Sequence, residues 1–146
     1  YEILAWLEFR RVLFRSSLSG VAMRDWKPIF VENSRIPVLL SYVAPIEIGA
    51  ITCGFIVFSR DKMDNRLKRH ETIHFQQFLE TLFIGFLLFY LMDFLWNLVL
   101  YRDGKIAYYK IRAEKEAYDN DHNPLYLRER RRWKWLFDME EGWRWK

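Results

Sequence analysis

The pattern of hydrophobic and polar positions first indicates a short β-rich segment. Residues 42–59 are apolar and β-branched, and Gly49 and Gly54 interrupt them. This pattern predicts one or two strands, arranged as a hairpin that turns at one of the two glycines. Residues 17–41 have mixed polarity and two prolines, so we expect an extended lead-in with a turn near residues 32–34.

A long helix is expected to follow the strands. Residues 60–69 are polar and charged, and Asp61 or Asp64 can cap a helix that begins near Asn65. We expect this helix to continue without a break into the strongly apolar segment Thr81–Tyr101.

Two more helices are predicted toward the C-terminus. Gly104 lies in a charged stop signal after the apolar segment, and the next helix is expected over residues 106–120. Asn123 can cap a further helix, and a proline suits its first turn. This third helix, Pro124–Asp138, is rich in arginine and tryptophan. Together the elements predict a mainly helical α+β fold.

The composition fits a folded protein with one hydrophobic core. Of the 146 residues, 51% are hydrophobic and 18% are aromatic, which is too apolar for intrinsic disorder. The formal net charge is +4. The single cysteine, Cys53, excludes an intrachain disulfide, and its apolar neighbours predict that it is buried. The chain shows no repeat and no low-complexity linker, so we expect a single domain over residues 42–146.

The first sixteen residues differ from the rest of the chain. Residues 1–16 read YEILAWLEFRRVLFRS, which resembles a translated sequencing-library adapter, and residues 7–16 match that reading codon for codon. A signal peptide needs its basic residues before the apolar stretch, whereas the arginines of this segment follow it. We therefore expect the natural protein to start at Met23, without a signal peptide, and to be cytoplasmic or membrane-associated.

The first indication of chemistry is the sequence His70-Glu71-Thr72-Ile73-His74. Residues four apart lie on one face of a helix, roughly 6 Å apart, so His70 and His74 can bind one ion through their imidazole nitrogens. Glu71 lies close enough to reach a water on that ion, and zinc lowers the pKa of such a water to about 7. This is the physical content of the H-E-x-x-H motif. The alternative is a pair of histidines that face solvent or fill a packing defect.

A zinc site needs at least one more protein ligand, and three glutamates compete for this role. Glu80 lies where extended motifs of this kind place a third histidine, but Gln77 replaces the glycine of that pattern. On an unbroken helix Glu80 also points away from the two histidines. Glu114 and Glu116 lie on the second predicted helix, about 200° apart around its axis, so both cannot face the same metal. The alternative for these two is a solvated helix face.

The sequence resembles the Glu-zincins, in which a second helix brings a carboxylate ligand to the H-E-x-x-H helix. A membrane-associated branch, the CAAX-prenyl-protease and heat-shock-protease type, carries E-x-x-A-D, and Glu114 to Ala117 match its first four positions. The resemblance implies Glu114 as the third ligand, with Glu116 as the fallback. The aspartate of the pattern is Tyr118 here, which leaves open what supports the first histidine. The stretch from about Trp26 onward also resembles small, uncharacterised bacterial and phage proteins.

This resemblance implies a zincin-like core and a function. The core would have a long H-E-x-x-H helix, a ligand-bearing second helix, a basic C-terminal helix, and a short hairpin or edge strand that aligns the substrate. The function would be that of a zinc-dependent hydrolase, a metallopeptidase acting on a peptide or protein. Glu71 would be the general base and Tyr118 the donor to the oxyanion, with Tyr108 and Tyr109 as rivals. The alternative is a non-catalytic metal-binding protein that associates with a membrane or a partner.

Two segments suggest contact with a membrane. Thr81–Tyr101 has 21 residues, which is long enough to cross a bilayer, although a core helix has the same composition. Asp93 and Asn97 are four residues apart and can form one polar stripe that faces other helices. The arginine- and tryptophan-rich residues 127–136 suit an anionic membrane interface. A plain surface helix is an equal alternative for them, and nucleic-acid binding is the least favoured.

Overall fold

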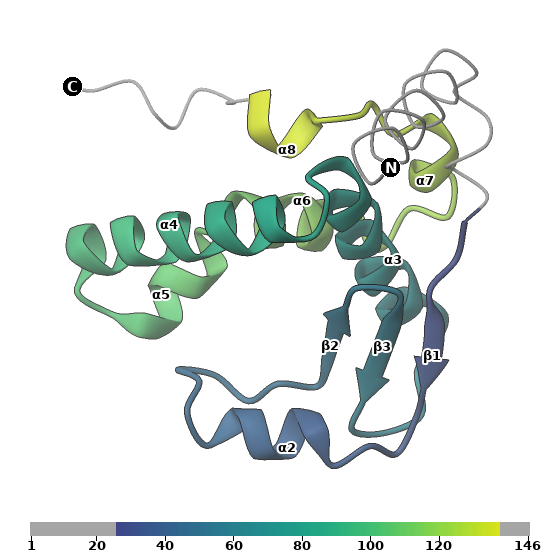
Figure 1. The fold of residues 1–146 in the computed structure, drawn as a ribbon, viewed down its shortest axis with the longest axis horizontal. Coiled ribbons are helices and arrows are strands. Elements are labelled where there is room, and N and C mark those ends of the chain that lie inside the picture. The colour runs from purple at the N-terminus through teal and green to yellow at the C-terminus, as the bar shows by residue number, and fades with distance from the viewer. Residues whose placement is uncertain (1–25, 138–146) are drawn as a thin grey trace, which may run out of the picture.

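The computed structural model describes residues 26–137. The adapter-like residues 1–16, the expected start at Met23 and the end of the third predicted helix at Asp138 lie outside the described residues. The fold is α+β and mainly helical, as predicted. In Figure 1 a small sheet lies below a layer of helices, and α3 (Asn65–Glu80) joins the two parts.

The sheet has three strands in the order β1-β3-β2. These are β1 (Ile29–Val31), β2 (Ala50–Cys53) and β3 (Ile56–Ser59). Strand β1 is parallel to β3 and β2 is antiparallel to it, with Ile51 opposite Phe58. The β2–β3 hairpin turns at Gly54, whose φ of +63° favours glycine. Because β2 is last in the strand order, it is an edge strand of this sheet. Cys53, at the end of β2, is exposed, whereas the sequence predicted that it is buried.

The lead-in differs in part from the expected extended segment. The turn near residues 32–34 is present, and Asn33 has a φ of 57° there. Strand β1 precedes this turn, but the short helix α2 (Ile36–Ser41) follows it. Pro37 lies in the first turn of α2, where a proline removes no helical hydrogen bond.

Helix α3 begins as predicted but ends earlier. The side chain of Asp64 caps it by accepting a hydrogen bond from the Leu67 N–H at 2.7 Å. The expectation of one unbroken helix is wrong, because Leu82 and Phe83 have φ values of 54° and 62°, and the chain turns there into α4 (Ile84–Tyr101). The turn brings residue 85 close to Thr81, and a glycine fits there because a Cβ atom would lie only 3.0 Å from the Cβ of Thr81.

The second predicted helix is also two helices, α5 (Gly104–Tyr109) and α6 (Arg112–Asn120). The break falls at Ile111, which is extended and fully buried. Asp93 of α4 explains it, because its carboxylate accepts hydrogen bonds from the backbone N–H of Arg112 at 3.2 Å and from the Arg112 guanidinium at 2.7 and 2.8 Å. A side chain from another helix thus supplies the N-terminal cap that Ile111 cannot.

The third predicted helix is likewise interrupted. It consists of α7 (Tyr126–Glu129) and α8 (Lys134–Phe137), and Trp133 between them has a φ of 62°. Arg130, at the end of α7, is turned into the interior. Trp135 of α8 packs into the main hydrophobic cluster with Phe86 of α4, at 5.7 Å between ring centroids. Residues 126–137, called the C-terminal segment below, therefore fold onto the core as two short helices and not as the single helix that was predicted.

We predict that Asp93→Ala lowers the free energy of unfolding by about 3 kcal/mol, because it leaves the Arg112 guanidinium and the first turn of α6 without their acceptor. The measurement is urea denaturation followed by circular dichroism. Asp103→Ala is the matched control, since Asp103 caps α5 through the Ile106 N–H at 2.8 Å in an exposed position and should cost about 1 kcal/mol. Equal losses in the two variants would contradict this role of Asp93.

Candidate metal centre

The histidine motif lies in the middle of α3, and its two histidines are buried. His70 and His74 are each 6% exposed, and their Nε2 atoms lie 3.2 Å apart. The spacing of four residues places the two rings on one side of the helix, where they lie edge to face with 4.8 Å between the ring centroids. Two imidazole nitrogens therefore converge on one point inside the protein.

Helix α6 packs beside α3 and brings Glu114 to the same point. Its Oε2 lies 3.6 Å from Nε2 of His70, and its Oε1 lies 3.5 Å from Nε2 of His74. Glu114 is 4% exposed, and its Oε2 has no hydrogen-bond partner among the described residues. A buried carboxylate oxygen without a partner is costly, and a cation would satisfy it. His70, His74 and Glu114 thus form a buried group that could bind a metal ion.

The charges at this point favour ionised side chains. Burial acts to lower the pKa of His74, but the charge of Glu114 and a hydrogen bond to it outweigh burial and raise the pKa to about 9. Burial conversely acts to raise the pKa of Glu114, and the two histidines hold it well below its usual range. Without a metal the site is therefore an ion pair, and a metal ion that binds here must displace a proton.

The second ring nitrogen of each histidine also has a partner. Nδ1 of His70 lies 3.5 Å from Oδ2 of Asp121, and Arg66 donates to the other oxygen of this carboxylate at 2.7 Å. In the family pattern, the aspartate that supports the first histidine stands at position 118, where this chain has a tyrosine. Asp121 is the carboxylate beside His70 instead. The sequence analysis missed it, although residues 114, 118 and 121 share one face of a helix.

His74 is oriented by Gln77, one turn later on α3. The amide Nε2 of Gln77 donates to Oε2 of Glu116 at 2.7 Å and to the Ala113 carbonyl at 3.1 Å. Its Oε1 must then be the acceptor for His74 Nδ1, 2.8 Å away. A metal ion would require the neutral ring, and this arrangement would then keep the ring proton on Nδ1 and leave the Nε2 lone pair free for the metal.

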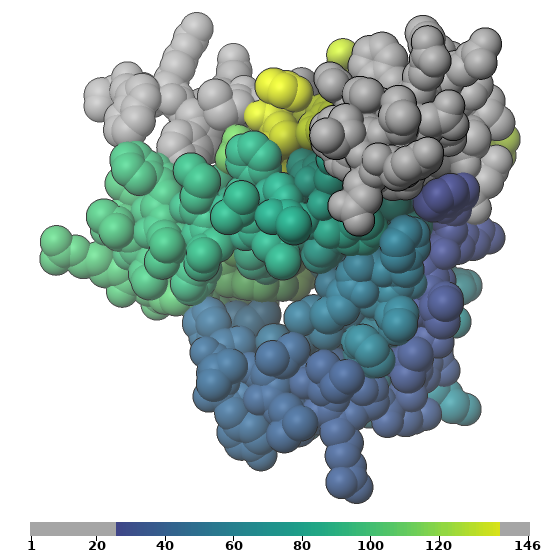
Figure 2. Space-filling view, in the orientation of Figure 1, coloured from purple at the N-terminus to yellow at the C-terminus, as the bar shows by residue number. Residues whose placement is uncertain are grey.

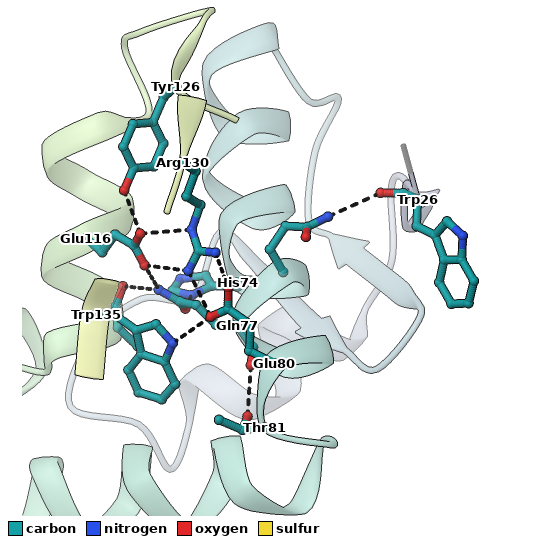
Figure 3. Close-up of polar contacts among 11 residues, drawn as sticks. Trp26, His74, Gln77, Glu80, Thr81, Glu116, Tyr126, Arg130 and Trp135 are labelled. Carbon is teal, nitrogen blue, oxygen red and sulfur yellow. Dashed lines mark hydrogen bonds and ion pairs between the residues drawn. The ribbon is translucent and has the colours of Figure 1, made fainter. Parts of the chain in front are cut away.

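The fallback ligand Glu116 lies on the other side of α6 and is bound elsewhere. Figure 3 shows its carboxylate among Gln77, Tyr126 and Arg130. Tyr126 donates to Oε1 at 2.5 Å, and Arg130 donates to both oxygens at 2.9 and 3.0 Å. Arg130 also pairs with Glu80, to which Trp135 donates at 3.1 Å. Neither Glu80 nor Glu116 therefore belongs to the metal group, and together they anchor the C-terminal segment.

Glu71, the proposed base, is 4% exposed and faces the edge strand. Its Oε2 accepts a hydrogen bond of 2.7 Å from the hydroxyl of Thr52 on β2. Glu71, His70, His74 and Glu114 all line one cavity of about 320 Å³. The other walls come from residues 44–46, 48 and 50–52, from Phe78 of α3, and from apolar and tyrosine side chains of α4 and α5. In Figure 2 the surface is hollowed between residues 44–52 and these last two helices.

The tyrosines that line the cavity are not the one preferred in the prediction, Tyr118. Tyr118 packs its ring against His70, at 4.6 Å between centroids, and it is not among the residues that line the cavity. Tyr109 is 46% exposed. Tyr108 lines the cavity, as does Tyr90 of α4, a residue that the sequence analysis missed and that donates to Oε1 of Glu114 at 2.7 Å.

Comparison of the chain with protein-family models, with curated proteins and with solved structures finds no match. The function must therefore be argued from the site itself.

We predict that Gln77→Met weakens zinc binding about 10- to 100-fold, the usual effect of losing a group that orients a ligating histidine. Methionine fills similar space but cannot accept the Nδ1 proton, while Arg130 still pairs with Glu116. The measurement is competition for zinc with a chromophoric chelator. Gln76→Met, at the next position of α3, is the matched control and should bind zinc like the unaltered protein. Equal zinc affinity in both variants would show that Gln77 does not orient His74.

Proposed function

We propose that the protein is a zinc-dependent hydrolase, most simply a metallopeptidase. The observation that carries this proposal is the convergence of three donor groups. The Nε2 atoms of His70 and His74 lie 3.2 Å apart, Oε1 of Glu114 lies 3.5 Å from the Nε2 of His74, and Oε2 lies 3.6 Å from the Nε2 of His70. Ligands of a tetrahedral zinc ion at bond lengths of about 2.1 Å lie about 3.4 Å from one another. Two imidazole nitrogens and one carboxylate are a set that catalytic zinc sites use, and they leave a fourth position open.

The balance of buried charge supports a divalent cation at this point. Glu71 and Glu114 are both buried, and the hydroxyls that bind them, those of Thr52 and Tyr90, are neutral. Burying two carboxylates is costly unless positive charge compensates them. A protonated His74 supplies one positive charge, whereas a zinc ion supplies two and binds Glu114 directly.

The surrounding residues suit hydrolysis. Zinc, when bound, would supply Lewis acidity toward a carbonyl group and lower the pKa of a water to about 7. Glu71, in the same cavity and held by Thr52, would take the proton of the attacking water and deliver it to the leaving amine. Tyr108 replaces Tyr118 as the preferred donor to the oxyanion, because Tyr108 lines the cavity and burial raises its pKa, so its hydroxyl keeps its proton.

The edge strand supports a peptide as the substrate. Strand β2 pairs with β3 on one side, and Ala50, Ile51 and Thr52 of this strand line the cavity. An extended peptide can add to such an edge by backbone hydrogen bonds, with alternate side chains entering pockets. The same strand holds Glu71, so a peptide bound along β2 would lie beside the base.

We predict that the full chain binds about one zinc ion, and that Glu71→Gln retains the zinc but lowers hydrolysis about 10²- to 10⁴-fold, the usual contribution of a general base. The measurements are metal analysis and cleavage of fluorescein-labelled casein and of a pool of quenched fluorescent peptides. Glu47→Gln is the matched control, since this glutamate side chain is 91% exposed.

The two measurements separate binding from catalysis. Absence of zinc at neutral pH, with both histidines intact, would overturn the proposed site. Zinc binding with equal cleavage by the protein and by Glu71→Gln would instead exclude Glu71 as the base. Zinc binding without cleavage of any probe would favour the non-catalytic metal-binding alternative.

A further inference from the structure

The distribution of polarity on α4 is the reverse of that on a helix facing water. Its two polar residues, Asp93 and Asn97, are only 8% and 3% exposed. Ten of its large side chains are instead at the surface, with exposures between 44% and 72%. This apolar face of α4 comprises Ile84, Leu87, Leu88, Leu91, Met92, Leu95, Trp96, Val99, Leu100 and Tyr101. Figure 2 shows α4 in green at the surface of the molecule.

Helix α4 lacks the burial that a core helix of a water-soluble domain would have. It has 18 residues with a mean hydropathy of 1.7, long and apolar enough to cross a membrane, yet only 17% of it is buried. A core helix of the same composition would be mostly buried. The predicted polar stripe faces inward, where Asp93 binds Arg112. The surplus of apolar surface is therefore on the outside, and water is an unfavourable environment for it.

Basic side chains lie at the C-terminal end of this face. Arg102, Lys105 and Lys110 are all exposed, and the Lys110 amino group lies 5.9 Å from the centre of the Tyr101 ring. The acidic residue of the same turn, Asp103, is engaged as the cap of α5. An apolar face that ends in cationic and aromatic side chains complements a lipid surface, where phosphates lie just above the hydrocarbon.

We propose that the apolar face of α4 lies in an anionic phospholipid bilayer, with Arg102, Lys105 and Lys110 at the level of the headgroups. Helices α5 and α6 contact the opposite side of α4, so lipid cannot surround this helix. It therefore lies along the membrane surface with one side immersed, as interfacial helices do. The inward polar stripe stays with the protein and needs no partner in the lipid.

The immersed helix also forms a wall of the cavity that contains the metal group. Phe86, Leu87, Tyr90 and Phe94 of α4 line that cavity, and Leu87 is at the same time 58% exposed on the apolar face. The cavity thus opens beside the lipid. If the proposed hydrolase activity holds, on which this step alone rests, the substrate is a membrane-bound peptide with an apolar side chain at the cavity.

The test is flotation of the full chain with vesicles of phosphatidylcholine mixed with phosphatidylglycerol. The protein should float with these vesicles, and a triple variant with Leu88→Glu, Met92→Glu and Leu95→Glu should reduce the bound fraction about tenfold or more, because three apolar side chains no longer enter the lipid. None of the three lines the cavity. Vesicles of phosphatidylcholine alone should bind the unaltered protein less, because they lack the negative charge that attracts the basic residues.

The matched control carries the same added charge elsewhere. Leu39, Tyr42 and Val43, at α2, are 64%, 82% and 84% exposed, and their triple glutamate variant should float like the unaltered protein. Circular dichroism and zinc binding confirm that each variant is folded. Flotation needs neither zinc nor turnover, so its result does not depend on the proposed hydrolysis.

Three results would overturn the proposal. The first is failure of the unaltered protein to float, and the second is flotation of the α4 variant to the same extent. The third is a stable dimer in sedimentation that forms without lipid, excludes vesicles and is lost in the α4 variant, since a second copy would then cover the apolar face. Equal binding to both kinds of vesicle would overturn the role assigned to the three basic residues.

Discussion

The constraint on which this structure depends is the compensation of its buried carboxylates. Most of them have a guanidinium partner: Asp93 pairs with Arg112, Asp121 with Arg66, and Glu80 and Glu116 share Arg130. These pairs join α4 to α6, α6 to α3, and α3 to the C-terminal segment. Glu71 and Glu114 differ, since neutral hydroxyls bind them. The only positive charge available to these two carboxylates among the described residues is that of the histidines, so more negative than positive charge is buried there, which favours a divalent cation.

The same pairs connect the metal group to residues far from it in the sequence. Arg130 holds Glu116, Glu116 accepts from Gln77, and Gln77 accepts the Nδ1 proton of His74. Each member of this chain is nearly or fully buried, so its hydrogen bonds are strong and a lost one would not be replaced by water. The C-terminal segment therefore does more than cover the core, because it fixes the orientation of one histidine through two intermediates.

The sequence predicted local features well and tertiary ones poorly. The spacing of four residues predicted that His70 and His74 lie together, and the resemblance nominated Glu114, which lies beside them. Two of the three helix breaks, those before α6 and after α7, were missed because their causes are distant in sequence. Asp93 caps α6 from another helix, and Arg130 leaves α7 to reach Glu80 and Glu116. Asp121 was missed because the family pattern has its aspartate at the position of Tyr118. The helical periodicity would have indicated Asp121, since residues 114 and 121 lie on the same face.

The two sides of α4 bear on the membrane contact that the sequence suggests for the apolar segment Thr81–Tyr101. One side carries Asp93, which determines where α6 starts and hence where Glu114 lies. The other side is apolar and exposed. A spanning helix would have to bury its polar stripe against other spanning helices, and a core helix would have to hide its apolar residues. An interfacial helix would suit both sides of α4, because protein covers the polar stripe and lipid would cover the apolar face. Under the proposed membrane contact, the helix whose Asp93 caps α6, and so positions Glu114, would itself be anchored at a membrane.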